Sequence, residues 1–254
     1  MSSEALPKYD PFVLMNKIHV IPRREEAVIE YTKQLLERAA SGPCRLAFVN
    51  AHAFNMCESN PEFFNHIMSA EQVVRDGAGM RIFYRAMGFT SGANMNGTDY
   101  IPQLIAAAGD RKIALLGTAD PYLAAAGEKI RAGGGNVVLQ MDGFRNEADY
   151  VVAVCEAKPE MIILAMGMPK QERVAAEIVK AYPAPCLIVC GGAVLDFMGG
   201  KVSRAPKFLR KYGMEWLYRL VLEPRRMFKR SVVGTAVFLA RTVKLSILRH
   251  FRKK

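Results

Sequence analysis

Short apolar runs alternate with segments of helical periodicity along the first 200 residues of the chain. A short apolar run bounded by turn residues is typical of a buried strand, and apolar residues spaced three and four apart are typical of an amphipathic helix. The expected strands cover residues 45–50, 72–77, 112–117, 136–141, 161–167 and 186–192. The expected helices cover residues 24–40, 61–71, 78–88, 99–109, 120–132, 147–157 and 169–181. This alternation predicts an α/β fold with a mostly parallel sheet and helices on both faces.

Polar residues and glycines gather where these strands end. In open parallel sheets, ligands bind beyond the carboxyl ends of the strands. The residues at these ends include Asn50, Asp76, Gly77, Gly117, Gly191, Gly192 and Asp196. Glycines let a ligand approach the backbone, and helix N-termini offer N–H groups to a phosphate. The pattern fits the rim of an anion or nucleotide pocket, and it equally fits ordinary punctuation between strand and helix.

The segment "MIILAMGMPKQERVAAE" carries the densest set of polar groups beside a buried strand. Pro169 suits the first turn of a helix. Lys170 has the point charge that a phosphate attracts, and Gln171 can both donate and accept hydrogen bonds. Glu172 has two interpretations, as a ligand for a sugar or ribose hydroxyl and as a helix cap.

Absent motifs narrow the class of protein. There is no GxGxxG after the early strands and no GxxxxGK[ST], which disfavours a dehydrogenase or a P-loop kinase. The five cysteines form no CxxC pair, and the polar opening is unlike a signal peptide, so we expect reduced thiols in a cytoplasmic protein. The four histidines lack any zinc-type spacing. We therefore expect no metal site and no cofactor.

Charge divides the chain into two parts. Residues 201–254 hold 16 Lys and Arg against 2 Asp and Glu, whereas residues 1–200 hold 19 against 22. We interpret residues 1–200 as the folded catalytic domain and residues 201–254 as a basic helical appendage. Such a tail is attracted to nucleic acid or to an anionic membrane surface.

The appendage has the pattern of an interfacial helix. Apolar residues recur at helical spacing at Val233, Val237, Ala240, Val243, Ile247 and Phe251. The longest uncharged stretch, residues 231–240, is about half of a membrane span. In such a helix, apolar side chains enter the lipid boundary while basic side chains contact anionic headgroups. The alternatives are a C-terminal helix docked on the core and an interface between copies of the chain.

Six blocks occur in one order along the chain: "DGAGM", "NGTDYI", "LLGTADPYLAAA", "GMPKQE", "GGAVLDFMGGKVSRAP" and "EWLYRLVLEPRRMFKR". Together they resemble the WecG/TagA/CpsF family of bacterial glycosyltransferases, over about residues 15–230. The resemblance implies a Rossmann-like core. It also implies inverting transfer of a sugar from a UDP-sugar to a polyprenyl-diphosphate-linked sugar at the membrane. Such transfer serves the assembly of teichoic acid linkage units, enterobacterial common antigen or exopolysaccharide.

The resemblance also assigns roles to residues. Asp76 matches the family's catalytic base, which takes a proton from the acceptor hydroxyl; the alternative is a turn aspartate. Gln171 matches a glutamine that contacts the nucleotide-sugar, and Asp196 matches an aspartate near the nucleotide. Arg204 has two interpretations, as a ligand of the diphosphate and as the partner of a neighbouring carboxylate. The other expected substrate contacts are Asn50, Gly77, Asp99, Gly117, Lys170, Glu172, Gly191 and Gly192.

Two positions depart from the family pattern. Asn94 stands where the family commonly has an arginine, a natural clamp for a diphosphate. Phe48 replaces a hydroxyl residue that often precedes the first-motif asparagine. The donor sugar therefore stays open among N-acetylmannosamine, its uronic acid, glucose and others. The departures also keep open a UDP-binding protein that has lost its chemistry.

The basic appendage supplies the expected contacts with lipid. The residues expected to bind the membrane or the diphosphate of the acceptor are Trp216, Arg219, Arg225, Arg226 and Arg230. We expect a peripheral protein on the inner face of the cell membrane, with a homo-oligomer as an open alternative. A nucleic-acid-binding protein is disfavoured, because the tail is strongly apolar and has no nucleic-acid motif.

Overall fold

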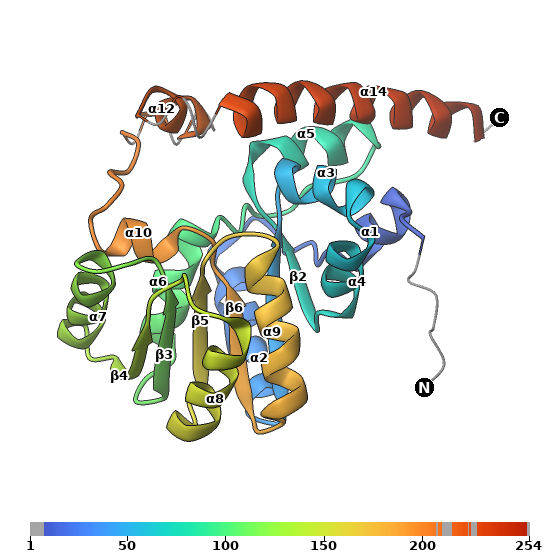
Figure 1. The fold of residues 1–254 in the computed structure, drawn as a ribbon. Helices are drawn as coiled ribbons and strands as arrows, with labels where there is room; N and C mark the ends of the chain where they lie inside the picture. Colours follow the sequence, from blue (N-terminus) through green and yellow to red (C-terminus); the bar gives the residue numbers. More distant parts are fainter. Residues whose placement is uncertain (1–7, 207, 210–214, 223, 225–227, 253–254) are drawn as a thin grey trace.

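The computed structural model describes residues 8–206, 208–209, 215–222, 224 and 228–252. Six parallel strands form one sheet in the order β2-β1-β6-β5-β3-β4, which confirms the predicted α/β class (Figure 1). Their bounds are β1 (Pro43–Val49), β2 (Gln72–Arg75), β3 (Lys112–Gly117), β4 (Asn136–Met141), β5 (Met161–Ala165) and β6 (Cys186–Cys190). Strands β5 and β6 are buried at every residue, as expected where helices cover both faces.

Helices surround the sheet. Their bounds are α1 (Pro11–Lys17), α2 (Glu25–Ala39), α3 (Ala51–Ser59), α4 (Pro61–Ser69), α5 (Gly77–Ala86), α6 (Gly97–Ala107), α7 (Tyr122–Ala132), α8 (Glu147–Ala157), α9 (Lys170–Ala181) and α10 (Val194–Met198). Helices α2, α6, α7 and α10 share one core cluster with the sheet. Helices α8 and α9 cover the opposite face, and α1, α3, α4 and α5 complete a third cluster beside β1 and β2.

The helix at residues 51–59 is a difference from the sequence prediction. The side chain of Asn50 accepts hydrogen bonds from the backbone N–H groups of His52 and Ala53, which starts α3 directly after β1. The sequence pattern treated this segment as a strand end only, because its nine residues are weakly amphipathic.

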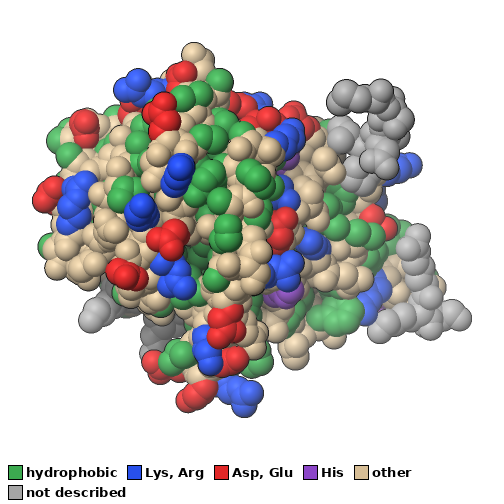
Figure 2. Space-filling model, turned by 90° about the horizontal axis from the view of Figure 1, so that it is seen from below, with side chains coloured by type: hydrophobic (Ala, Val, Ile, Leu, Met, Phe, Trp, Pro, Cys, Tyr) green, Lys and Arg blue, Asp and Glu red, His purple; other side chains and the backbone are tan. Residues whose placement is uncertain are grey.

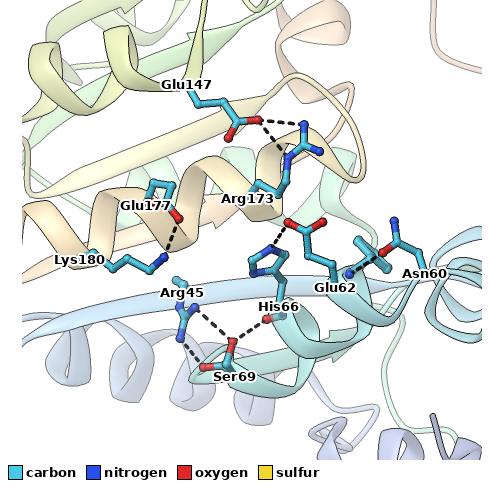
Figure 3. A network of polar contacts seen from close by, with 10 residues as sticks. Arg45, Asn60, Glu62, His66, Ser69, Glu147, Arg173, Glu177 and Lys180 are labelled. Carbon is cyan, nitrogen blue, oxygen red and sulfur yellow. Dashed lines mark hydrogen bonds and ion pairs between the residues drawn. The ribbon is translucent and has the colours of Figure 1, made fainter. Parts of the chain in front are cut away.

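Ion pairs join helix α9, which begins with the polar "KQE" residues, to α8, and strand β1 to the segment before β2. Arg173 pairs with Glu147 at the start of α8, with 2.9 Å between Nη2 and the carboxylate (Figure 3). Arg45 of β1 pairs with Glu71 at 2.8 Å and contacts Ser69 at the end of α4. The first pair fixes the starts of α8 and α9 at the carboxyl edge, whereas the second fixes the amino end of β1 to the segment between α4 and β2.

The C-terminal segment crosses the carboxyl edge. It contains α12 (Glu215–Leu222), a π-helix, η1 (Phe228–Val233), and α14 (Gly234–Arg252), which lies over α3 and α5 (Figure 1). Phe238 is fully buried against the rings of Phe54 and Phe83, at centroid distances of 5.5 and 6.4 Å. Arg241 pairs with Glu58 at 2.6 Å. One face of the predicted interfacial helix is therefore docked on the core.

At the amino ends of the strands, basic and acidic side chains are interspersed on the surface, as Figure 2 shows.

Within the described residues, no helix is long and apolar enough to cross a membrane.

Candidate active site

Asp76 and Asn50 lie side by side because β1 and β2 are neighbours. Val49 and Arg75 are in register at the ends of these strands, so the residues that follow them meet. Asn50 Nδ2 lies 3.3 Å from Asp76 Oδ2. Since Asn50 Oδ1 accepts the N–H groups that open α3, its amide N–H group faces the carboxylate. The amide thereby orients the carboxylate that was predicted to act as the base.

Gly77 and Asn94 fix the turn after Asp76. Gly77 has a φ of +82°, a conformation that glycine adopts without steric cost. Its N–H group donates to Asn94 Oδ1 at 2.7 Å. Asn94, the departure from the family pattern, thus holds the backbone beside the candidate base.

A second polar group lies at the ends of β3 and β5. These strands are neighbours, yet β3 continues to β4 on one side and β5 continues to β6 on the other. Such a switch in direction opens a crevice at the carboxyl edge of a sheet. Thr118 Oγ1 donates to Asp196 Oδ1 at 2.5 Å, and Lys201 Nζ lies 3.2 Å from the same oxygen. Asp196 therefore faces this crevice as a paired carboxylate.

The backbone of Gly117 packs closely against the neighbouring strand ends at this crevice. A Cβ atom at Gly117 would lie 2.3 Å from the carbonyl oxygen of Ala165 on β5. Gly143, after β4, also packs against Gly117, since its own Cβ atom would lie 3.2 Å from the Cα of Gly117. The three strand ends meet with backbone facing backbone, which only glycine allows.

Gln171 connects α9, β6 and the glycine turn after β6. Its side chain is fully buried. Nε2 donates to Glu172 Oε1 at 2.8 Å and to the carbonyl of Cys190 at 3.2 Å, while Oε1 accepts the N–H group of Gly192 at 3.0 Å. The amide therefore positions the turn of Gly191 and Gly192. Its predicted contact with the nucleotide-sugar stays a prediction.

Glu172 is a buried carboxyl group. The residue is 3% exposed, and Oε2 has no hydrogen-bond partner among the described residues. Burial raises the pKa of Glu172 to about 7, although the hydrogen bond from Gln171 lowers it. The pKa of this carboxyl group therefore lies far above that of an exposed glutamate.

Lys170 is bound within the protein. Its Nζ donates to the carbonyl oxygens of Gly143 at 3.0 Å and Arg145 at 2.8 Å, and it lies 5.2 Å from the centroid of the Tyr150 ring. The ammonium group holds the loop after β4 against the start of α9. Its predicted contact with a phosphate stays a prediction.

Arg204 and Asp99 form an ion pair. Arg204 Nη1 lies 2.7 Å from Asp99 Oδ1, which joins the segment after α10 to the first turn of α6. Arg204 was interpreted either as a ligand of the diphosphate or as the partner of a carboxylate, and the structure shows the contact with a carboxylate.

The side chains predicted to bind the membrane or the acceptor stay a prediction. Arg225 and Arg226 lie outside the described residues, as do the side chains of Trp216, Arg219 and Arg230. Among the residues that are described, no group of three or more His, Cys, Asp or Glu side chains is placed to hold a metal ion.

Arg75 is a site residue that sequence reasoning missed. It is 3% exposed, and its guanidinium group donates to the carbonyl oxygens of Ser91, Gly77 and Gly92. Burial and the nearby Arg23 lower the pKa of Arg75 to about 10. The sequence did contain a signal for it, an arginine inside the apolar run "VVRDG". A charged side chain in a buried strand is rare unless it binds a partner.

A parallel sheet with a carboxylate, glycine turns and a switch point at its carboxyl edge is typical of open α/β enzymes, which bind their ligands at that edge. Residues 14–252 match the model of the glycosyl transferase WecG/TagA/CpsF family, so the protein belongs to this family. The family assignment expected from the sequence blocks is confirmed.

Two relatives are named for the same activity. One, from Bacillus spizizenii, is 26% identical over 186 residues, which are 70% of this chain and 72% of the relative. The other, from Bacillus subtilis, is 27% identical over 170 residues, which are 65% of this chain and 66% of the relative. Each is an N-acetylglucosaminyldiphosphoundecaprenol N-acetyl-beta-D-mannosaminyltransferase.

Proposed function

We propose that the protein is an inverting glycosyltransferase that moves a sugar from a UDP-sugar to a polyprenyl-diphosphate-linked sugar in the assembly of a cell-surface polysaccharide or exopolysaccharide. The names of both relatives support the acceptor class, since each acts on a sugar linked to undecaprenyl diphosphate. The observation that carries the proposal is the Asp76 carboxylate, which Asn50 orients at the carboxyl edge of the sheet in a chain of this family.

Asp76 acts as the general base. Its carboxylate takes the proton of the acceptor hydroxyl while the hydroxyl oxygen forms a bond to the anomeric carbon of the donor. The bond from that carbon to the UDP oxygen breaks on the opposite side, and UDP leaves with the electron pair. A single displacement of this kind inverts the anomeric configuration.

The donor extends along the edge of the sheet. Strands β1, β6 and β5 separate β2 from β3, so the ends of β2 and β3, which precede Asp76 and Thr118, lie about 19 Å apart at the usual strand spacing. The nucleotide occupies the crevice near Thr118 and Asp196, and the sugar points toward Asp76. The turn at Gly191 and Gly192, between them, lets the diphosphate approach the backbone. Because no DxD-type pair stands at a strand end, we also propose that transfer needs no metal.

The exposed face of α14 contacts the inner face of the cell membrane. The apolar side chains on this face are Val237, Leu239, Val243, Ile247, Leu248 and Phe251. They lie on a helix that Phe238 and Arg241 attach to the active-site edge, so an acceptor in the lipid would meet Asp76 from this side.

The test is acceptor-dependent release of UDP from a panel of UDP-sugars, with a short polyprenyl-diphosphate-linked sugar in detergent. We expect release from one donor and a decrease in kcat of about 10²- to 10⁴-fold in Asp76→Asn. The control is Asp149→Asn, because Asp149 is an exposed carboxylate on α8. Wild-type protein that binds UDP and releases none with any pairing would contradict the proposal and favour a non-catalytic UDP-binding protein.

A further inference from the structure

A strongly basic pocket of about 440 Å³ lies beside the candidate base, where α2 and α5 begin. Four arginines line it, together with one acidic residue, Glu25. These arginines are Arg23, Arg24, Arg75 and Arg81. Gly77, which directly follows Asp76, lines the same pocket. We refer to it as the arginine pocket.

The four guanidinium groups lack carboxylate partners. Among the described residues, none of the four forms an ion pair with Asp or Glu. Arg75 is the extreme case, because it is buried and donates only to backbone carbonyls. Burial of the Arg75 charge is costly, and Arg23 and Arg81 repel it, whereas the adjacent Asp76 carboxylate attracts it.

Hydrogen bonds within the protein hold two of the pocket's arginine side chains in place. Arg23 Nε donates to the carbonyl of Gly92 at 2.9 Å, and its Nη2 donates to Ser91 Oγ at 2.8 Å. Arg75 binds the same two residues from the other side. The segment that carries Asn94 is therefore clamped by two guanidinium groups, and the pocket keeps its shape without a ligand.

Two helix N-termini add to the positive potential. Helix α2 begins at Glu25 and helix α5 at Gly77, with 15 and 10 residues respectively. The N–H groups of a first helical turn have no acceptor within the helix, and the helix dipole makes this end positive. Helices that begin at the wall of a pocket favour an anion inside it.

We propose that the arginine pocket binds a diphosphate group of a substrate, next to the reacting hydroxyl. The inference rests on the proposed function, since it places the anion beside Asp76. Guanidinium groups bind phosphoryl oxygens in pairs, and the pocket offers several such groups around one space. The diphosphate has two sources, the lipid-linked acceptor and the departing UDP. The acceptor agrees with the placement of the donor diphosphate at Gly191 and Gly192, whereas UDP in this pocket would contradict that placement.

The first experiment measures binding of inorganic pyrophosphate to the full chain by calorimetry. The variants are Arg24→Gln, Arg81→Gln and the double variant, because these two side chains have no hydrogen bond or ion pair within the described residues. We expect the affinity to fall about tenfold in each single variant and further in the double one. The control is Arg85→Gln, an exposed arginine at the other end of α5.

Equal affinity of wild type and the double variant for pyrophosphate would overturn the inference. This readout needs no turnover, so it separates the inference from the proposed function. Lost binding in the double variant supports the pocket even if no UDP-sugar is consumed. If UDP release is observed but pyrophosphate binding is unchanged, the function stands and the pocket assignment fails.

Steady-state kinetics of Arg81→Gln identify the source of the diphosphate. A raised KM for the lipid-linked acceptor, with an unchanged KM for the UDP-sugar, assigns the pocket to the acceptor. The reverse assigns it to the donor. Unchanged values of kcat and of both KM constants would overturn the inference.

Discussion

At the scale of single residues, polar side chains at the carboxyl edge mostly hold other protein groups. Asn50 uses one amide atom to start α3 and the other to orient Asp76. Asn94 accepts the N–H group of Gly77, and Gln171 accepts that of Gly192. Each amide fixes a backbone turn that a substrate would approach. The site is therefore held in position before any substrate binds, as electrostatic catalysis requires.

Glu172 predicts a pH-dependent stability. Its carboxyl has a pKa of about 7 in the folded protein and an ordinary value of 4.5 when unfolded. Between these values only the folded state holds the proton, so the free energy of unfolding decreases as pH rises from about 4.5 to about 7. The total decrease from this group is about 3 kcal/mol. The adjacent thiol of Cys57 stays neutral in this range, because burial raises its pKa to about 12.

Urea unfolding at pH 5 and pH 8 measures this effect. We expect Glu172→Gln to lose most of the decrease and to be more stable than wild type at pH 8. Glu177→Gln on the same helix is the control, since Glu177 is exposed and pairs with Lys180. Identical pH profiles for wild type and Glu172→Gln would show that the buried carboxyl does not titrate as predicted.

At the scale of elements, α14 has one face for the protein and one for its surroundings. Phe238 fills the space between α3 and α5, and Ser246 donates to the carbonyl of Ala86 at the end of α5. On the other side of the helix, Val243 is 59% exposed and Phe251 is 69% exposed. The alternative of a helix docked on the core is confirmed for one face, and the interfacial helix stays a prediction for the apolar outer face.

The two phenylalanines of α14 predict effects on stability of very different size. Phe238→Ala removes a fully buried ring, and we expect the free energy of unfolding to decrease by about 3–5 kcal/mol. Phe251→Ala changes an exposed ring near the end of the helix, and we expect a change within about 0.5 kcal/mol. Chemical denaturation followed by circular dichroism measures both. A loss below about 1 kcal/mol for Phe238→Ala would contradict the docking of α14.

At the scale of the whole molecule, the excess of basic side chains lies outside the part of the chain that forms the sheet. The near-neutral residues 1–200 form the sheet and its helices, while residues 201–254 carry the excess of basic side chains. The described helix of that segment crosses the edge where Asp76 lies (Figure 1). Helix α14 and the candidate base therefore lie on the same side of the molecule.

This arrangement predicts binding to anionic vesicles. We expect the protein to sediment with vesicles that contain an anionic phospholipid, and less so at high salt or with neutral vesicles. The double variant Val243→Ser and Ile247→Ser should bind about tenfold more weakly, because both side chains are half exposed on the outer face.

The control for vesicle binding is Val152→Ser. Val152 is 57% exposed, but it lies on α8, away from the appendage. Equal vesicle binding by wild type and the double α14 variant would contradict membrane contact through this face. Binding that is lost equally in the α8 variant would indicate a general effect of surface polarity.

The sequence by itself determined the elements and the family. Strand and helix periodicity are properties of contiguous residues, so all six strands and seven helices appear near their predicted positions. The glycines at the strand ends were also readable, since a conformation such as that of Gly77 favours one residue type. Helix α3 was missed, because its start depends on a single cap by Asn50.

Only the tertiary structure decided how these parts meet. The strand order places Asn50 beside Asp76, and no local pattern encodes which strands are neighbours. The same holds for Lys170, whose charge is taken by carbonyl groups 25 and 27 residues away. The arginine pocket joins side chains from three separate segments, so its charge density is invisible along the chain. Periodicity determines local structure, whereas a site arises from contacts between residues that are distant in sequence.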